Sequence, residues 1–188
     1  MKFMKAALGA MMLAALPLAA QAEEMSYSYI DLGWNEADIS GAPKGDGIAL
    51  RGSVGFAENF FVFADYSKFG FPGNLDVDLY SVGLGGRIGI GSNVDLVGRA
   101  GYTKADASAG GFSLDDDGYL VSAGLRARPA DSFELEGHVI YRDYGSGSDD
   151  TAFAVGGRYF FTKNFAVGAE YEIGDDVDVL FVGVRLSF

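Results

Sequence analysis

Apolar and polar side chains alternate along the last eleven residues of the chain. One face carries an apolar residue at every second position: Leu180, Val182, Val184, Leu186 and Phe188. The other face is small or charged from Gly183 onward. Because successive side chains of a strand point to opposite faces, this segment is predicted to be a β-strand. The same pattern predicts ten strands in all, at residues 25–35, 46–57, 60–69, 78–90, 94–104, 117–128, 133–144, 151–161, 165–174 and 178–188.

The breaks between these segments are of two kinds. Four are short turns, at residues 58–59, 91–93, 129–132 and 162–164. The others are expected to be longer polar loops, at residues 35–45, 69–77, 105–116 and 145–150, with a brief one at 175–177. Short turns on one side and longer loops on the other are typical of barrels that cross a membrane. An even number of strands also returns both ends of the barrel to the same side.

No apolar run beyond residue 22 is long enough for a membrane-spanning helix. Unpaired backbone groups cannot lie in hydrocarbon, so a membrane protein without such helices must close its strands into a barrel. The sequence therefore predicts an all-β fold, a ten-stranded antiparallel up-and-down transmembrane β-barrel.

Aromatic residues mark both ends of the predicted strands. An even spacing puts a tyrosine on the same face as the apolar residue that opens each strand after a short turn. The extracellular belt is predicted to contain Trp34, Tyr66, Tyr102, Tyr141 and Tyr171, and the periplasmic belt Phe60, Phe133, Phe165 and Phe188. Two such belts around an apolar band suit the two interfaces of a bilayer.

All eight arginines fall on the polar face of the predicted strands, together with seven carboxylates. The planar guanidinium suits paired, poorly hydrated sites, so this face is predicted to be the lumen. The predicted charge network consists of Arg51, Arg87, Arg99, Arg126, Arg128, Arg142, Arg158, Arg185, Asp31, Asp65, Asp95, Glu134, Glu136, Glu170 and Glu172. In a narrow barrel these long side chains are expected to close the lumen.

The arrangement inside the lumen is also predicted. We expect Arg87, Arg126 and Arg158 to form the middle of a ladder of ion pairs, with Glu136, Glu170 and Asp65 among the partners. A glycine lies two residues before an arginine at four places, where it is expected to clear space for that arginine: Gly85, Gly124, Gly156 and Gly183.

The first 22 residues have the organisation of a secretory signal peptide, with a basic start, an apolar stretch and a small-x-small end. The apolar stretch at residues 6–20 is shorter than the ~20 residues that span a bilayer. Cleavage is predicted between Ala22 and Glu23, which leaves residues 23–188 as the barrel domain.

Charge and cysteine content narrow the class of protein. Two of the 14 basic residues lie in the signal peptide, so the mature chain carries 12 basic and 26 acidic residues. This excess of acid argues against binding of nucleic acid, whose phosphates need a basic surface. The chain has no cysteine, so an exported form has no disulfide framework.

Candidate chemistry is sparse. His138 is the only histidine, which excludes a multi-histidine metal site, and Ile140 stands where a lipid-modifying enzyme would need a serine. The acidic segments 115–117 and 175–178 lack the spacing of a calcium-binding loop. We predict no enzyme activity, no cofactor and no metal site; the acidic loops are solvated, with weak divalent-ion bridging to lipopolysaccharide phosphates as the alternative.

Several motifs resemble those of small bacterial outer-membrane barrels of the OmpX and OmpA-barrel kind, and most closely the short outer-membrane proteins of xanthomonad-type bacteria. The motifs are Ser26-Tyr27-x-Tyr29, Asn59-Phe60-x-Val62-Phe63-x-Asp65-Tyr66, Asp117-Gly118-Tyr119-x-Val121-x-Ala123-Gly124 and Asp143-Tyr144. The resemblance implies residence in the outer membrane, among its lipid and lipopolysaccharide, and recognition of Phe188 by the barrel-assembly machinery. Relatives with eight strands make eight the alternative strand count.

Three functions are compatible with these observations. The first is a structural or surface-interaction protein with a closed lumen, acting through short acidic extracellular loops on a ligand that the sequence does not reveal. The second is a small pore for ions or small solutes. The third is a lipid-modifying enzyme that uses His138.

Overall fold

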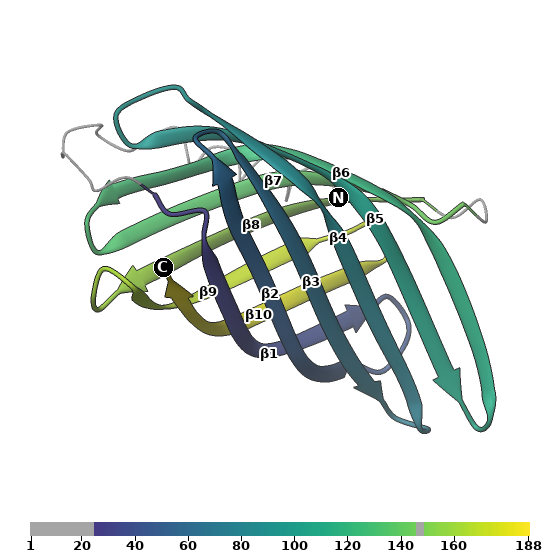
Figure 1. Cartoon of the computed structure of the whole chain (residues 1–188). Helices are drawn as coiled ribbons and strands as arrows, with labels where there is room; N and C mark the ends of the chain where they lie inside the picture. The colour runs from purple at the N-terminus through teal and green to yellow at the C-terminus, as the bar shows by residue number, and fades with distance from the viewer. Residues whose placement is uncertain (1–24, 146–148) are drawn as a thin grey trace.

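The computed structural model describes residues 25–145 and 149–188 and shows a closed antiparallel β-barrel (Figure 1). Its strands are β1 (Tyr29–Ile39), β2 (Gly45–Ala57), β3 (Phe60–Phe71), β4 (Leu75–Gly89), β5 (Val94–Ala109), β6 (Phe112–Ala130), β7 (Phe133–Asp143), β8 (Asp149–Phe160), β9 (Phe165–Ile173) and β10 (Val177–Ser187). Each strand pairs with its neighbours in the chain, and β10 pairs with β1 to close the barrel. The predicted fold and the count of ten strands are confirmed.

The barrel has two distinct ends. We call the end where β1 begins and β10 finishes the terminal end, because Tyr29 lies opposite Ser187 there. The opposite end is called the far end. The predicted signal peptide and the cleavage site between Ala22 and Glu23 lie outside the described residues. No helix among the described residues is long and apolar enough to cross a membrane.

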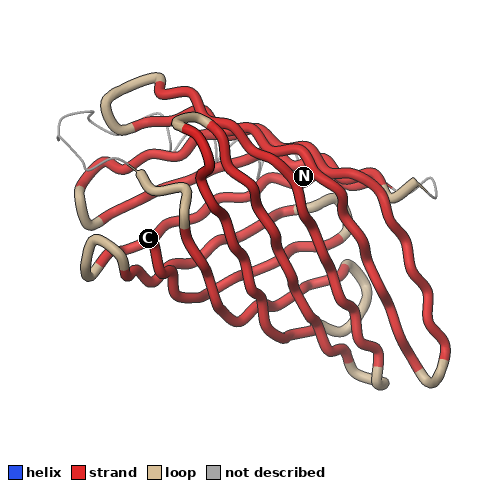
Figure 2. The backbone as a smooth tube through the Cα atoms, in the orientation of Figure 1, coloured by secondary structure: helices blue, strands red, loops and turns tan. Residues whose placement is uncertain are grey.

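Most of the predicted long loops at the far end are wrong, because the strands continue through them (Figure 2). The segment 105–116 is a hairpin of β5 and β6, turned by Gly110 and Gly111 at φ angles of 57° and 90°. Residues 69–77 likewise belong mainly to β3 and β4. Glycine adopts positive φ without steric cost, so two residues suffice to reverse the chain where the sequence predicted a loop of twelve.

The first predicted strand is displaced along the chain. It was expected at residues 25–35, whereas β1 begins at Tyr29 and extends to Ile39. Residues 25–28 instead lie against the inside of the barrel, where Met25 and Tyr27 are buried beside Phe61 and Phe63. The small apolar core of the described structure is therefore inside the lumen.

Side chains alternate between the outside and the lumen along each strand. On β1, Leu32 is 55% exposed on the outer face, while Asp31 is 1% exposed in the lumen. The outer face exposes apolar side chains strand after strand, for example Leu84 on β4 and Val182 on β10. A water-soluble barrel would bury that surface, whereas a transmembrane barrel presents it to lipid.

Candidate functional site

Each of the seven predicted lumen carboxylates forms an ion pair with a different arginine. The pairs are Arg51–Glu170, Arg87–Asp95, Arg99–Asp65, Arg126–Glu134, Arg142–Glu172, Arg158–Glu136 and Arg185–Asp31. They come from strands all around the barrel and meet inside it. The eighth arginine, Arg128, is also on the lumen side and buried, but it has no carboxylate partner among the described residues.

Glu134 on β7 is the centre of the network near the terminal end, and its side chain is fully buried. One of its oxygens accepts from Arg126 Nη2 at 2.9 Å, and the other accepts from Arg158 Nη1 at 3.4 Å and Arg185 Nη1 at 3.3 Å. Three arginines from three strands thus converge on one carboxylate. Arg126 and Arg158 come from the two strands that flank β7, whereas Arg185 comes from β10, which is not a neighbour of β7, so this centre also connects strands that are not paired in the wall.

Bidentate pairs reinforce this centre and the region above it. Arg185 donates from Nε and Nη2 to the two oxygens of Asp31, at 2.7 Å each. Towards the far end, Arg142 donates from Nη1 and Nη2 to Glu172 at 2.7 and 3.0 Å. Two parallel hydrogen bonds fix both distance and orientation, so these pairs hold the guanidinium planes in place.

One predicted pair of the ladder is present, Arg158 with Glu136, whereas the other predicted partners are wrong. Arg87 lies near the terminal end with Asp95 on the neighbouring strand, and Arg126 reaches Glu134. Glu170 and Asp65 pair with arginines outside the expected middle, Arg51 and Arg99. Strands tilt and are staggered around a barrel, so parity places a side chain in the lumen but leaves its height undetermined.

The four glycines that precede arginines do not clear space for those arginines. A Cβ at Gly85 would overlap the ring of Phe61, and one at Gly124 would approach His138 Nδ1 to 2.5 Å. The glycine that accommodates an arginine is Gly168, where a Cβ would lie 2.5 Å from Arg158 Cγ. The relevant neighbour is on the adjacent strand, which spacing along one strand cannot reveal.

The segment before β1 lies in the lumen at the terminal end. Tyr27 stacks on Phe61 with ring centroids 5.0 Å apart, and its hydroxyl donates to Asp95 Oδ2 at 2.8 Å. The guanidinium of Arg126 lies 4.6 Å from the centroid of the same ring. The sequence predicted a strand here, so the position of this segment inside the lumen was missed.

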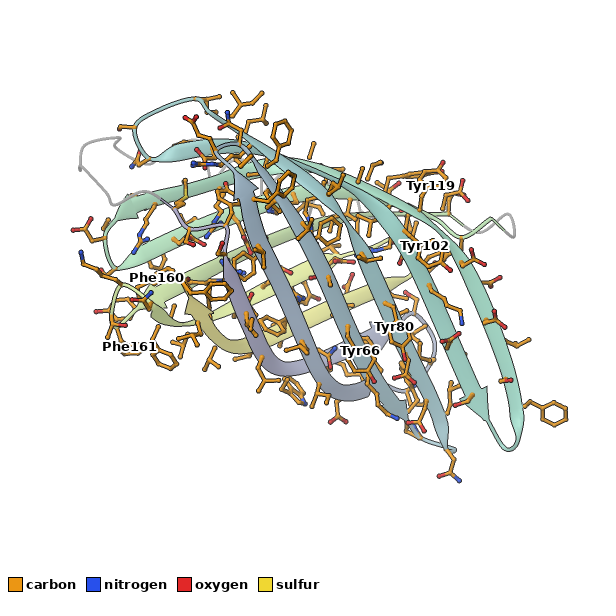
Figure 3. All side chains as sticks on the ribbon, in the orientation of Figure 1. Tyr66, Tyr80, Tyr102, Tyr119, Phe160 and Phe161 are labelled. Atoms are coloured by element: carbon orange, nitrogen blue, oxygen red, sulfur yellow. The ribbon has the colours of Figure 1, made fainter. Side chains whose placement is uncertain are left out.

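The predicted aromatic residues lie on the outer face in two groups. Figure 3 shows Tyr66 beside Tyr80 and Tyr102 near Tyr119 towards the far end, with Phe161 towards the terminal end. The remaining predicted belt residues also face outward on their strands: Trp34, Tyr141 and Tyr171 in the far-end belt and Phe60, Phe133, Phe165 and Phe188 in the other. Tyr80 and Tyr119 were missed because they lie on the strands that return from the far end.

Carboxylates accept hydrogen bonds from this far-end belt. Tyr66 donates to Asp78 Oδ1 at 2.6 Å, Tyr119 to Asp143 at 3.2 Å and Tyr171 to Asp178 at 3.1 Å. Trp34 Nε1 donates in the same way to Asp46 at 3.3 Å. Each aromatic group therefore has an apolar body against the apolar band and a polar tip directed at charged groups, as expected at a membrane–water interface.

Beyond this belt, the polarity of β3, β4, β5 and β6 is inverted. Ser81 and Thr103 face the lumen and hydrogen-bond to each other at 3.1 Å, so residues at even spacing from them share their face. Apart from Asp116, which lies opposite Ala105, that inner face is apolar above the belt: Phe69, Phe71, Leu75, Val77, Leu79, Ala105, Ala107, Ala109, Phe112 and Leu114. The outer face carries charge instead, including Lys68, Asp76, Lys104, Asp106, Asp115 and Asp117.

We call this part of β3–β6 the far-end sheet. Its outer charges pair with one another, as Lys104 Nζ does with Asp106 at 2.6 Å, and this hydrogen bond raises the pKa of Lys104 above its usual value. Its inner face is partly uncovered, because Phe112 is 84% and Leu114 78% exposed. A sheet with charge outside and apolar groups inside is built for water, so the lipid-facing part of the barrel ends at the tyrosines.

One edge of the far-end sheet is open. β6 pairs with β5 along its whole length, from Phe112 opposite Ala109. Its pairing with β7 begins only at Tyr119, opposite Asp143. Residues 112–116 therefore have a strand neighbour on one side alone among the described residues, whereas residues 117–118 lie against residues 143–145. Figure 1 shows this hairpin reaching well past β9 and β10.

His138 lies in the lumen on β7, with Nε2 3.9 Å from Glu136. Its Nδ1 is buried without a hydrogen-bond partner in the described structure. The described residues contain no group of three or more acidic, histidine or cysteine side chains that could hold a metal ion. The arrangement around His138 is therefore that of an isolated polar group in a wall of ion pairs.

Comparison with known proteins identifies the class. Residues 6–179 match the family of the outer membrane protein beta-barrel domain, and the chain belongs to this family. The protein is therefore an integral protein of the bacterial outer membrane. No curated protein matches the chain. The likeness to xanthomonad-type proteins is not tested by these comparisons and stays a prediction.

Solved structures of small outer-membrane barrels are similar in fold. OprG of Pseudomonas aeruginosa is 12% identical, with a TM-score of 0.51 over 90% of this chain and 99% of that chain. The KdgM porin is 15% identical, with a TM-score of 0.48 over 85% and 99% of the two chains. Ail, the attachment invasion locus protein of Yersinia pestis, is 21% identical, with a TM-score of 0.40 over 88% and 100%. The likeness to OprG shows a shared fold.

Proposed function

We propose that this protein is a closed outer-membrane barrel that acts at the cell surface, as a structural or interaction protein, through its far-end sheet. We place the terminal end in the periplasm and the far end outside the cell, because short turns are usually periplasmic and longer hairpins extracellular in such barrels. The outer aromatic belt then lies at the level of lipopolysaccharide, and Phe188 at the periplasmic end is available to the assembly machinery.

The observation that carries the closed lumen is the convergence of three arginines on Glu134. Glu134, Asp31, Arg126, Arg158 and Arg185 are all at least nine-tenths buried inside the barrel. Tyr27 lies in the lumen beside Arg126. A bore wide enough for hydrated ions would expose these groups, so the lumen at this level is filled by protein.

Single-channel recording tests this part of the proposal. The refolded barrel, inserted into a planar bilayer, is expected to give no stable conductance steps above the bare membrane at neutral pH. A small pore is the competing function, and regular steps from the wild-type protein would establish it in place of the closed barrel.

The open edge of β6 supports an interaction by strand addition. Backbone N–H and C=O groups along residues 112–116 are available to an extended segment of another protein. Such a segment would lie beside Phe112 and Leu114 on the inner face and beside Asp115 on the outer face. Its own residues should therefore alternate between apolar and basic.

A second copy of this chain fits the edge poorly. Pairing two β6 edges would bring the acidic rows at 115–117 together, and like charges facing one another across strands are destabilising. Acidic residues on an edge strand thus disfavour self-association and leave the edge open to a basic partner. The far-end sheet selects its partner by charge as well as by backbone pairing.

Synthetic peptides test the partner class. A nine-residue peptide of alternating valine and lysine is expected to bind the refolded barrel, measured by fluorescence anisotropy. A valine–glutamate peptide should not bind, and N-methylation at alternate residues should abolish binding because it removes the backbone donors. Asp115→Lys should weaken binding of the lysine peptide about fivefold, since one favourable charge contact becomes unfavourable.

Asp38→Lys is the matched control, because Asp38 is an exposed carboxylate of a different extracellular hairpin. It should leave the affinity unchanged. Equal binding of lysine and glutamate peptides, or equal effects of the two variants, would rule out recognition at the β6 edge.

A further inference from the structure

Arg128 has an environment different from that of the other lumen arginines. Its side chain is buried, with 4% of the residue exposed, yet no carboxylate of the described chain forms an ion pair with it. Its Nε and Nη2 donate to the backbone carbonyl of Asp131 at 3.2 and 2.7 Å. Its guanidinium carbon lies 4.4 Å from the centroid of the Phe160 ring. Arg128 Nη1 has no hydrogen-bond partner among the described residues.

A cavity of about 320 Å³ opens beside Arg128 at the periplasmic end of the lumen. Its lining includes three cationic side chains, Arg126, Arg128 and Lys163. Glu134 and Phe188 also line it. Glu134 already accepts from three arginines, and Phe188 accepts a hydrogen bond from Ser26 Oγ at 3.3 Å.

The position of Arg128 calls for an anion. Arg128 is a buried cation at the wall of this cavity, and no carboxylate of the described residues forms an ion pair with it. A buried charge that lacks a counter-charge is costly, and a hydrogen bond between two ions is among the strongest that can relieve the cost.

We propose that this cavity is a binding site for a phosphate group, with Arg128 Nη1 as its principal donor. The volume exceeds that of a single water molecule many times, so the site has room for a phosphate and its substituent. Two sources supply this chemistry at the periplasmic face: the headgroup of an inner-leaflet phospholipid, and a soluble phosphate compound of the periplasm. The proposal is independent of the partner at the extracellular end.

The test begins with the mature chain refolded in alkyl glucoside micelles, which contain no phosphate. Inorganic phosphate is added at constant ionic strength against chloride, and binding is followed by phosphorus NMR line broadening and by the thermal unfolding midpoint. Wild-type protein is expected to broaden the signal and to unfold at a higher temperature with phosphate. A wild-type protein that responds equally to chloride and phosphate would overturn the proposal.

Variants assign the site. Arg128→Gln should weaken phosphate binding by about tenfold or more, the loss expected for a hydrogen bond to a charged group. Lys44→Gln removes a cation from the opposite end of the barrel and should change nothing. Phosphate binding by Arg128→Gln equal to that of wild type would overturn the assignment. If this variant does not refold, Arg128→Lys is measured instead. It keeps the charge but loses the fixed guanidinium donors, so it should weaken phosphate binding by a smaller factor, and binding equal to that of wild type would overturn the assignment.

The source is distinguished by repeating the titration in phospholipid nanodiscs. Loss of the response there, with the response intact in micelles, shows that lipid headgroups occupy the site. A response retained in nanodiscs shows that the site takes a soluble phosphate compound. Either outcome supports the site and names its ligand.

Discussion

At the scale of single residues, the lumen is held by charge pairs whose members depend on one another. Glu134 is the clearest case, because removing its charge leaves Arg126, Arg158 and Arg185 sharing fewer acceptors in a buried space. Breaking a buried pair costs more than the pair itself contributes, since an uncompensated charge remains.

Glu134→Gln tests this dependence. We expect the free energy of unfolding, measured by urea titration in lipid, to fall by about 3–5 kcal/mol. Glu36→Gln is the matched control, because Glu36 pairs with Lys44 at an exposed hairpin and should contribute about 1 kcal/mol or less. Equal effects of the two changes would mean that the lumen is well hydrated.

The sequence predicts which residues face the lumen but not which residues form ion pairs there. Parity put all eight arginines on one face, and the structure places each of them inside the barrel. Partner choice depends on strand stagger, which is why Arg87 pairs with Asp95 instead of joining the middle of the barrel. Arg128, without a carboxylate, is also invisible to a count of charges.

At the scale of strands, the inversion of polarity in β3–β6 sets the limit of the membrane. Below Tyr66, Tyr80, Tyr102 and Tyr119 the outer face is apolar, and above them it is charged. The sequence contains this signal as a change of parity, but the predicted loops at 69–77 and 105–116 hid it. Alternation that switches face was interpreted as absence of a strand.

A pair of arginine substitutions locates this boundary. Leu84→Arg introduces a charge on the outer face between the two belts and should lower the free energy of unfolding by about 2–4 kcal/mol. Ser108→Arg makes the same change on the outer face of the far-end sheet and should cost little. Unfolding in lipid vesicles measures both, and similar losses would place Ser108 within the membrane.

At the scale of the whole molecule, two groups of residues of different origin lie in the lumen. The ion pairs belong to the wall, whereas Tyr27 belongs to a segment outside the barrel strands. The presence of the charged wall residues follows from the alternation along the strands and could be predicted in outline. The position of residues 25–28 could not, because their alternating pattern resembles that of a strand.

Tyr27→Ala separates the contribution of this segment from that of the ion pairs in the wall. The change removes the ring stacked on Phe61 and the hydrogen bond to Asp95, but leaves the ion pairs around Glu134 in place. We expect the variant to remain closed in planar bilayers, with a loss of stability typical of a truncated buried aromatic, about 3–5 kcal/mol. Conductance steps in this variant alone would show that the segment, and not the wall, seals the barrel.

The pairing of β1 with β10 has a consequence for the order of folding. Every other pairing between strands joins consecutive strands of the chain and can form as soon as one hairpin is complete. The seam is different, because Trp34 must find Val182, close to the opposite end of the sequence. Until the last strand arrives, the sheet has two free edges that would pair with any strand in reach. The barrel therefore closes only when β10 pairs with β1. Until then, the cell must protect a sheet with two unpaired edges from pairing with other strands.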